Sequence, residues 1–354
     1  MSNITKIGII GFGKRGKTHL RNYIGIKEAK VIAICDLKKP EPAGQKIGYF
    51  KDYKKMLESE CIDAVSLCLP NFLHYKITRN ILDKGKHVLV EKPITIITKE
   101  AKDLAMISRG KNLVCMVGYN LRFDMKIQKI KSIINSGELG KILMVRARQS
   151  HNWGGKEPFD WLMDKSKSGG GTLIDNATHY LNLFEYLVGD ISELQAFSNN
   201  LSFGKKVEDN ALVALKFRNG AIGSIETSWQ DASGRNNELV IWGSKAVLEY
   251  KDSNDKQIMQ TKSYFQDNDE WNRMKIEKIY LPKGIEQISK TINLDNDRNL
   301  SAENTMNMLK YFLKLINDQE ERNKYTKSNF PEKTVKIIEA VYKSIKSKKV
   351  INIH

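Results

Sequence analysis

The sequence lacks any apolar run long enough to cross a membrane. A transmembrane helix needs about 18 or more consecutive apolar residues, and the 354-residue chain contains no such stretch. Its first residues lead into a strand-like IGIIG and lack the charged and apolar regions of a secretory signal peptide. These absences predict a soluble, cytoplasmic protein with no membrane partner.

Cysteine is scarce, and metal-binding motifs are missing. Cys35, Cys61, Cys68 and Cys115 lie far apart within apolar segments, as reduced core thiols do and as disulfide frameworks do not. The sequence also contains no Cys-x-x-Cys and no His-x-x-x-His pair. We therefore predict that the protein has no metal site.

Arginine is scarce for a chain with a formal charge of +17. Only 12 of the 58 basic residues are arginine, and the lysines are spread along the whole chain. Arginine is the residue favoured for bidentate contacts with phosphates and bases. The composition therefore argues against a nucleic-acid partner, while the positive surface would attract an anionic substrate or cofactor.

Strand and helix patterns alternate over residues 1–120. Apolar runs typical of buried strands lie at 6–11, 31–36, 63–69, 87–90 and 113–117. Helical patterns lie between them at about 16–26, 52–58, 72–84 and 98–109. Strands that alternate with helices predict an α/β domain with a doubly wound parallel sheet.

The pattern changes over residues 121–354. After a helical segment at 124–135, strand-like segments follow one another with short turns such as Asn219-Gly220. These segments lie at 139–150, 192–203, 207–217, 221–230, 237–243 and 246–250. Helical patterns return at 301–317 and 332–347, whereas 252–275 cannot be assigned. We predict a second, α+β domain with a large, mostly antiparallel open sheet.

A glycine loop follows the first strand. Its sequence GFGKRG fits G-x-G-x-x-G, opens a helix, and is followed by Asp36 at the end of the next strand, which is the arrangement of a dinucleotide site. Backbone N–H groups of such a loop bind a pyrophosphate at the helix N-terminus, and the acid binds ribose hydroxyls. The predicted cofactor contacts here are Gly11, Phe12, Gly13, Lys14, Arg15, Gly16, Asp36 and Leu37.

The choice between NAD and NADP depends on the end of the second strand. Asp36 repels a 2′-phosphate, which favours NAD, but Lys38 and Lys39 follow closely and would accommodate a phosphate. We favour NAD and keep NADP as the alternative.

Lys92 is the first candidate outside this loop. It follows the strand HVLV within HVLVEKP, so it lies at the carboxyl edge of the parallel sheet, where ligands bind in such folds. A lysine at a strand end is also compatible with a solvated terminus.

Several longer pieces occur in a characteristic order. They are IGIIGFGKRGKTHL, IDAVSLCLPNFLHYKITRNILDKGKHVLVEKPI, VGYNLRF, SGELGKI, SGGGTLIDNATHYLNLFEYLVG and VEDNALVALKFRNGAIGSIETSW. With these pieces the sequence resembles the Gfo/Idh/MocA oxidoreductases, the glucose–fructose oxidoreductase and inositol dehydrogenase family, over nearly its whole length. It departs from the family at Asn182, where an acid is common, and at Ile94-Thr95, where Leu-Ala is usual.

The resemblance implies an NAD(P)-binding Rossmann domain at 1–120 and a substrate-binding domain at 121–354, whose open sheet serves oligomerisation as a homodimer or homotetramer. It implies hydride transfer at a carbinol or keto carbon of a sugar, cyclitol or nucleotide-sugar. Lys92 matches the family's EKP lysine, and Asp175 and His179 match its Asp-x-x-x-His pair. The matching cofactor positions further along the chain are Leu69, Pro70, Asn71, His74, Glu91, Lys92 and Asn120.

The stretch GGGTLIDNATHYLN contains the predicted catalytic pair. Helical spacing gathers its apolar residues on one side, whereas Asp175 and His179 are neighbours on the other. We expect His179 to act as acid and base, Asp175 to orient its ring and favour its protonated form, and Lys92 to stabilise developing alkoxide. We expect the glycines to allow close approach of the backbone to ligand. The predicted substrate contacts are Lys92, Tyr119, Arg122, Trp153, Trp161, Asn176 and His179.

Two other functions remain open from the sequence. One is an NAD-dependent glycosidase on the same scaffold, which the family resemblance allows. The other is a redox-sensing dinucleotide-binding regulator, although the chain shows no helix-turn-helix segment, and a sensor does not need Lys92, Asp175 and His179 together.

Overall fold

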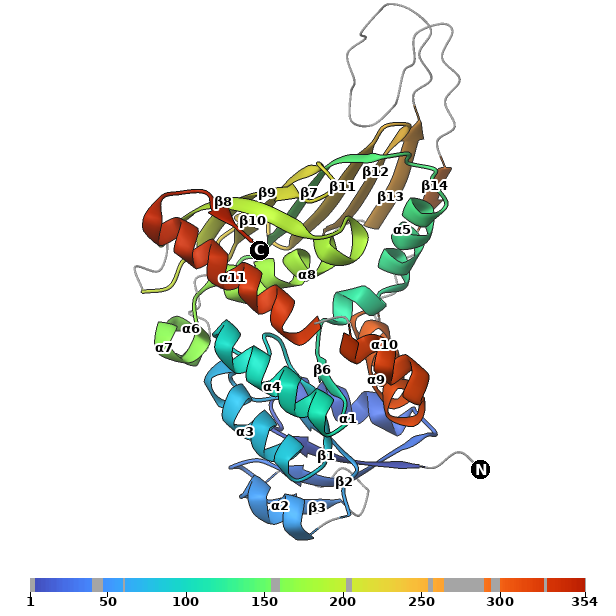
Figure 1. The fold of residues 1–354 in the computed structure, drawn as a ribbon, viewed down its shortest axis with the longest axis vertical. Coiled ribbons are helices and arrows are strands. Elements are labelled where there is room, and N and C mark those ends of the chain that lie inside the picture. Colours follow the sequence, from blue (N-terminus) through green and yellow to red (C-terminus); the bar gives the residue numbers. More distant parts are fainter. Residues whose placement is uncertain are drawn as a thin grey trace, which may run out of the picture.

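The computed structural model describes residues 4–39, 47–59, 61–153, 160–201, 206–253, 257–263, 290–293, 300–327 and 330–353. Within these ranges the chain forms two sheets, and each sheet belongs to a separate lobe of the molecule (Figure 1). No helix in the described part of the chain is long and apolar enough to cross a membrane.

The first sheet has the strand order β3-β2-β1-β4-β5-β6, and all of its neighbouring strands are parallel. Its strands are β1 (Thr5–Ile10), β2 (Ala29–Cys35), β3 (Gly48–Phe50), β4 (Ala64–Leu67), β5 (His87–Val90) and β6 (Cys115–Val117). The helices between them are α1 (Lys14–Ile24), α2 (Tyr53–Ser59), α3 (Asn71–Asp83) and α4 (Thr98–Gly110). This is the order of a doubly wound dinucleotide-binding sheet, which confirms the predicted fold class.

Strand β1 shows why apolar runs form this sheet. Ile7 and Ile9 belong to one buried cluster and Ile10 to another, because successive side chains of a strand point to opposite faces. Both faces are covered by helices, so the strand has no polar side chain from Ile7 to Ile10.

The second sheet has the order β14-β13-β12-β11-β7-β10-β9-β8-β15 and is antiparallel except between β7 and β10. Its strands are β7 (Ile142–Ser150), β8 (Ile191–Asn199), β9 (Asn210–Phe217), β10 (Ile222–Ser228), β11 (Asn236–Gly243), β12 (Ala246–Ser253), β13 (Gln257–Ser263), β14 (Lys290–Asn293) and β15 (Ile351–Asn352). The large, mostly antiparallel sheet is thus also confirmed.

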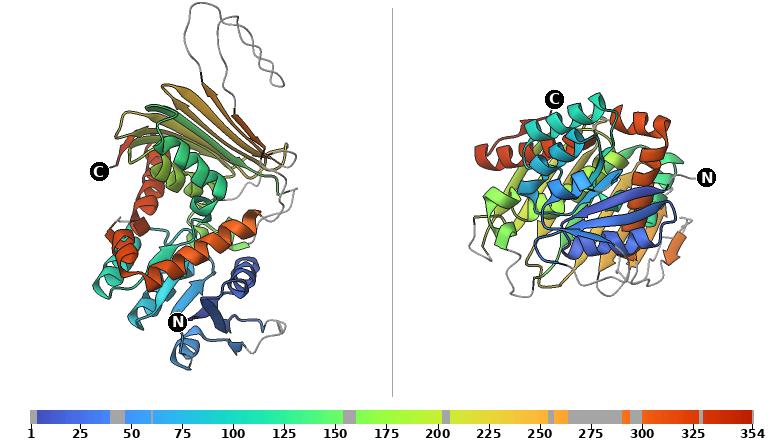
Figure 2. Two further views of the ribbon diagram at one scale, coloured as in Figure 1. Left: turned by 90° about the vertical axis from the view of Figure 1, so that its right-hand side faces the viewer. Right: turned by 90° about the horizontal axis from the view of Figure 1, so that it is seen from below.

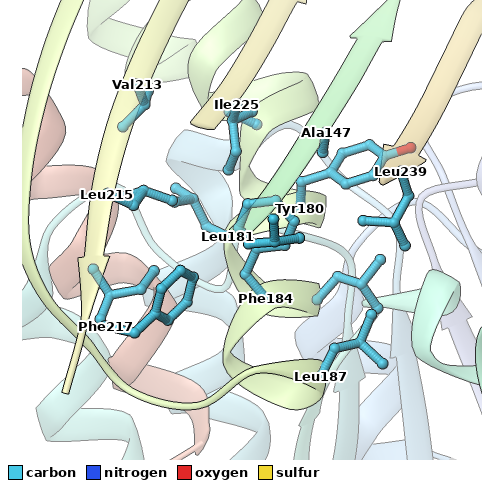
Figure 3. Packing of buried hydrophobic residues seen from close by; sticks show 14 of the residues in the cluster. Ala147, Tyr180, Leu181, Phe184, Leu187, Val213, Leu215, Phe217, Ile225 and Leu239 are labelled. Atoms are coloured by element: carbon cyan, nitrogen blue, oxygen red, sulfur yellow. The ribbon is translucent and has the colours of Figure 1, made fainter. Parts of the chain in front are cut away.

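Helices cover one face of the second sheet. They are α5 (Met125–Asn135), α8 (Thr178–Leu187) and α11 (Phe330–Ser347), whose apolar residues share one buried cluster with the inward side chains of the strands. Figure 3 shows Tyr180, Leu181 and Phe184 of α8 pointing at the inner faces of β9, β10 and β7. Short helices link the lobes: η1 (Asn120–Phe123), α6 (Asp160–Met163), α7 (Lys165–Ser168) and the π-helical turn η2 (Leu173–Ala177).

Helix α9 (Leu300–Asn317) returns to the first sheet and is followed by α10 (Gln319–Lys327). Met308 and Phe312 of α9 lie in the same buried cluster as Ile7 and Leu20, and Figure 2 shows the orange α9 beside the blue α1. The segment 121–354, predicted as the second domain, therefore also supplies part of the core around the first sheet.

Some elements have no counterpart in the sequence predictions. They are β3, η1, α6, α7, α10, β14 and β15. The turn η2 falls in a stretch with predicted helical spacing, but its form is π-helical. Strand β13 falls within 252–275, which had no assignable pattern, and 264–275 lies outside the described residues. Most of these elements are short or lie at a sheet edge and have too few residues to show a period. Helix α10 is 9 residues long but buries none of them, so it has no apolar stripe to indicate a helix.

We predict that Phe312→Ala lowers the free energy of unfolding by about 3–5 kcal/mol, because it removes a fully buried ring between α9 and the first sheet. Urea denaturation measures the change. Met106→Ala, at an exposed position of α4, serves as the control and should stay within about 0.5 kcal/mol. Equal effects of the two substitutions would contradict the packing of α9 on this core.

Candidate active site

The glycine loop joins β1 to the N-terminus of α1. Gly11 adopts a φ of +87°, and a Cβ at Gly16 would lie 2.1 Å from the carbonyl oxygen of Gly11. A Cβ at Gly13 would meet no described atom within 4 Å. These are the three roles of a dinucleotide loop: a tight turn, an open approach for the pyrophosphate, and close packing of helix on strand. No side chain of the described residues caps α1 at Gly13, so its first N–H groups suit a phosphate.

The Asp36 side chain forms a hydrogen bond with the backbone of this loop. Its carboxylate accepts hydrogen bonds from the backbone N–H of Phe12 at 2.6 Å and of Lys38 at 3.1 Å. Leu37, also predicted as a cofactor contact, projects into solvent with 84% of its side chain exposed. The strand-end acid therefore lies against the glycine loop, where an adenosine ribose would reach it.

Glu91 lies beneath the same loop. One of its oxygens, Oε1, accepts from Nε of Arg15 at 2.8 Å and faces Nε2 of the buried His19 at 3.0 Å. Burial alone would raise the pKa of Glu91, but Arg15 and His19 outweigh burial and hold that pKa well below its usual range. The contact orients Arg15, the second residue of α1, beside the predicted pyrophosphate position.

His19, Cys68 and Glu91 are grouped as metal ligands can be, with one donor atom each within 4.8 Å of the others. The Glu91 carboxylate is already paired with the Arg15 guanidinium at 2.7 Å, and Nδ1 of His19 lies 3.6 Å from the Cys68 sulfur. The carboxylate charge is thus neutralised by arginine, without a cation from solution.

Four predicted cofactor positions follow β4: Leu69 and Pro70 lie in the loop, and Asn71 and His74 lie at the start of α3. His74 is fully buried, and its ring nitrogens lie 2.7 Å from the carbonyl oxygens of Pro93 and Leu69. Asn71 donates to the carbonyl oxygen of Ser168 at 2.7 Å. Both ring nitrogens of His74 thus face the loops that it joins, and its contact with the cofactor stays a prediction.

Lys92 connects the two lobes. It follows β5, and its Nζ donates to the Asp175 carboxylate at 2.7 Å and to the Asp175 carbonyl oxygen at 2.6 Å. The side chains of Lys92 and Asp175 are only 16% and 24% exposed. Burial raises the pKa of Asp175, but Lys92 outweighs burial, so that pKa lies below its usual value. The structure thus brings together two predicted catalytic residues that are 83 positions apart.

Trp229 is a site residue that the sequence predictions missed. Its Nε1–H donates to the second oxygen of Asp175 at 3.3 Å, and the residue is fully buried after β10. The only available signal was its position at the end of a strand-like segment, in the piece ending GSIETSW.

His179 differs from expectation. The Asp175 carboxylate is bound by Lys92 and Trp229, and Nδ1 of His179 is buried without a hydrogen-bond partner in the described residues. Burial, assisted by Lys92, lowers the pKa of His179 to about 3, although Asp175 opposes the shift. Asp175 thus favours protonation of the ring, as predicted, but burial outweighs it. The predicted hydrogen bond by which Asp175 would orient the ring through Nδ1 is not among those of the described residues.

The three glycines before η2 pack against protein. A Cβ at Gly170 would lie 1.8 Å from the Tyr342 hydroxyl, and one at Gly171 would lie 1.9 Å from the Glu208 carbonyl oxygen. The buried Glu208 carboxylate accepts from the N–H of Gly171 at 2.8 Å and of Leu173 at 3.1 Å, and from the Tyr342 hydroxyl at 2.8 Å. The expectation that these glycines approach ligand is corrected: they admit Glu208 and Tyr342, which anchor the turn that carries Asp175.

Tyr119 and Arg122, two predicted substrate contacts, lie near the start of the second lobe. Tyr119 is 1% exposed, and its ring meets the His179 ring edge-on with centroids 6.4 Å apart. Nε of Arg122 donates to the Asn182 side chain at 2.6 Å. The family departure at Asn182 therefore provides a neutral acceptor for a buried arginine.

The remaining predicted contacts lie around the same turn. Asn176 is buried and donates to the Thr172 hydroxyl at 3.2 Å, and Asn120 and Trp161 are half-buried in η1 and α6. Trp153 packs edge-on against His151 with ring centroids 5.2 Å apart. His151, which the sequence predictions left aside, is close enough to Asp175 for their charges to interact.

A parallel sheet with a dinucleotide loop, facing a lysine, a carboxylate and a neutral histidine, defines a nicotinamide-dependent oxidoreductase. Residues 5–119 match the family model "Oxidoreductase family, NAD-binding Rossmann fold", and residues 127–249 match the "GFO/IDH/MocA C-terminal domain". The chain therefore belongs to the GFO/IDH/MocA family and is an NAD-binding oxidoreductase.

Individual relatives agree with this placement. The chain is 29% identical to levoglucosan dehydrogenase of Pseudarthrobacter phenanthrenivorans, over 68% of this chain and 70% of that protein. It is 27% identical to myo-inositol 2-dehydrogenase of Thermotoga maritima, over 69% of this chain and 74% of that protein. A solved levoglucosan dehydrogenase in complex with NADH and levoglucosan has the same fold, with a TM-score of 0.81 at 20% identity over 99% of both chains.

We predict that Gly171→Ala lowers the free energy of unfolding by about 1–3 kcal/mol, because the new Cβ must displace the Glu208 backbone. Gly110→Ala, at the end of α4 where a Cβ meets no described atom within 4 Å, is the matched control and should change stability by less than about 1 kcal/mol. Thermal and urea unfolding of both variants test this. A neutral Gly171→Ala would show that the close approach is not required.

Proposed function

We propose that the protein transfers hydride between NAD and a secondary carbinol or keto carbon of a sugar or cyclitol, with His179 as the acid and base. The observation that carries the proposal is the unpartnered, buried Nδ1 of His179 near a Lys92 ammonium held by Asp175. Both lie at the carboxyl edge of the parallel sheet, where ligands bind in doubly wound folds.

The cofactor fits the first domain. The open approach at Gly13, the uncapped N-terminus of α1 and the acid at Asp36 would hold the pyrophosphate and the ribose. NAD supplies the hydride acceptor or donor when it is bound. Asp36 disfavours a 2′-phosphate, which supports NAD over NADP.

Lys92 would stabilise the charge on the reacting oxygen. An ammonium has three N–H donors, and in the described residues two of them are directed at Asp175. The third is available to a substrate hydroxyl, and the fixed positive charge favours developing alkoxide.

His179 would take the hydroxyl proton. With a pKa of about 3, the ring is neutral at physiological pH, and Nδ1 can accept a hydrogen bond in the tautomer that has its proton on Nε2. An alcohol that loses hydride becomes a protonated carbonyl, which is a far stronger acid than this imidazolium. Proton transfer therefore accompanies hydride transfer, and the reverse reaction returns the proton to the same oxygen.

The substrate class is supported by the relatives, which are named for levoglucosan and myo-inositol. Trp153 and Trp161 are half-buried and would serve as aromatic contacts for the C–H surface of a sugar ring. Purified protein incubated with NAD or NADP and a panel of cyclitols, free sugars, anhydrosugars and nucleotide-sugars should change nicotinamide absorbance with a cyclitol or sugar. Turnover confined to nucleotide-sugars would replace the proposed class, and glycoside cleavage without net reduction would indicate the hydrolase instead.

We predict that His179→Ala lowers kcat by about 10²–10⁴-fold, because the proton acceptor is lost, while the dissociation constant of NAD is unchanged. In the wild-type enzyme, the pKa of His179 is lowered to about 3, so the ring does not titrate between pH values of about 5 and 8. The value of kcat/KM should therefore show no fall in this range that comes from protonation of His179. Stopped-flow kinetics and fluorescence titration with NAD measure the two quantities. Full turnover by His179→Ala would remove this residue from the mechanism.

We also propose that a second copy of the chain covers the outer face of the second sheet. Phe197 and Leu212 pair across β8 and β9 and are 61% and 43% exposed, and Ile222 on β10 is 52% exposed. The same face has both charge signs, including the pair Arg146–Glu238, so a two-fold axis could match it with itself.

We predict that Phe197→Lys converts the oligomer to a monomer, because it places a charge in the apolar part of this face. Light scattering during size exclusion gives the mass. Met106→Lys, which adds the same charge to the exposed surface of α4, should leave the mass unchanged. A wild-type monomer at all concentrations tested would exclude this interface.

A further inference from the structure

We infer that Trp229 is a positioning residue for the reaction: its indole N–H fixes the Asp175 carboxylate in the orientation that seats the Lys92 ammonium. This inference rests on the proposed roles of Asp175 and Lys92. It gives Trp229, which directly follows β10 of the second sheet, a role in the proposed hydride transfer. Trp229 lies far from the cofactor loop in the sequence.

The two oxygens of Asp175 are divided between two donors. Oδ1 accepts from Lys92 at 2.7 Å, and Oδ2 accepts from Nε1 of Trp229 at 3.3 Å. Lys92 also donates to the Asp175 backbone at 2.6 Å. Rotation of the carboxylate about its Cβ–Cγ bond would break both side-chain contacts at once, so Trp229 adds to the restraint that Lys92 places on this rotation.

Trp229 is itself held rigidly. It is fully buried, its backbone N–H donates to the Asp209 carbonyl oxygen at 2.9 Å, and its own carbonyl accepts from Trp153 at 3.3 Å. An indole has one polar atom, a donor, and here that donor points at the one carboxylate that binds Lys92. A ring needed only to fill the core would be satisfied by phenylalanine.

The indole contact also favours the ionised carboxylate. A donor directed at a carboxylate lowers its pKa, since the bond is stronger to the charged form. The other titratable groups that act on Asp175 are Lys92, after β5, His179 on α8 and His151 after β7, and all three act in the same direction. Loss of the Trp229 donor should therefore raise the pKa of Asp175. As the pH falls, Asp175 would then become protonated, and lose its ion pair with Lys92, at a higher pH than in the wild-type protein.

Trp229→Phe keeps most of the ring and removes the donor. We expect kcat to fall by about tenfold with little change in KM for NAD, and the acid limb of the kcat/KM profile to move up by about one pH unit. Trp242→Phe, at a half-buried position on β11, is the matched control and should leave the profile unchanged. A loss of stability with an unmoved acid limb would reduce Trp229 to a packing residue and overturn the inference.

The hydrogen bond can also be observed directly in the wild-type fold. The chain has five tryptophans, and in the nitrogen–proton spectrum of protein labelled at the indole nitrogens, one resonance should shift in Asp175→Asn and follow the ionisation of Asp175 with pH. If no indole resonance responds to Asp175→Asn, the inference fails, even where Trp229→Phe does not fold. If instead the indole responds but Asp175→Asn and His179→Ala retain full turnover, the proposed function fails and the contact is structural.

Discussion

The ion pair between Lys92 and Asp175 is the constraint on which the rest of the site depends. Partly buried charges are stable only when their partners are well placed, and here the ammonium meets both the carboxylate and the carbonyl oxygen of Asp175. Lys92 comes from the end of a strand in the first sheet, and Asp175 from a turn packed on the second. The distance between the two lobes is therefore set at the proposed point of reaction.

Helix α11 maintains that distance away from the site. Its Glu339 accepts from Thr98 at the start of α4, in the first lobe, and its Thr334 and Tyr342 contact Asn182 and Glu208 in the second. Figure 1 shows α11 between α4 and α8. Because Glu208 binds the backbone before η2, the same helix that joins the lobes also anchors the turn that carries Asp175.

Local patterns were sufficient to predict the first domain and its loop. The signals are the apolar strands, the glycines from Gly11 to Gly16 and the acid Asp36, and all of them are recognised from short stretches of sequence. The same patterns placed Lys92 at the end of a strand, but its predicted role came from the resemblance of EKP to the family. Trp229 and Glu208 were not, because their roles exist only through partners 54 and 37 positions away. A regular helical period suggested an Asp175–His179 pair, whereas the fold gives the carboxylate to Lys92. Similarly, the apolar stripe of α9 predicts a buried face but does not indicate which sheet will cover it.

The assignment of Asp175 to Lys92 divides the chemistry between the lobes. A carboxylate paired with His179 would raise the pKa of the ring and favour imidazolium. In the proposed mechanism, the carboxylate turned to Lys92 keeps the positive charge beside the reacting oxygen and leaves the imidazole beside the proton. The first lobe would then supply the cofactor site and the cation, and the second would supply the base. Trp153 and Trp161, the proposed aromatic substrate contacts, belong to the second lobe, so a change of substrate preference there would leave the proposed nicotinamide site intact.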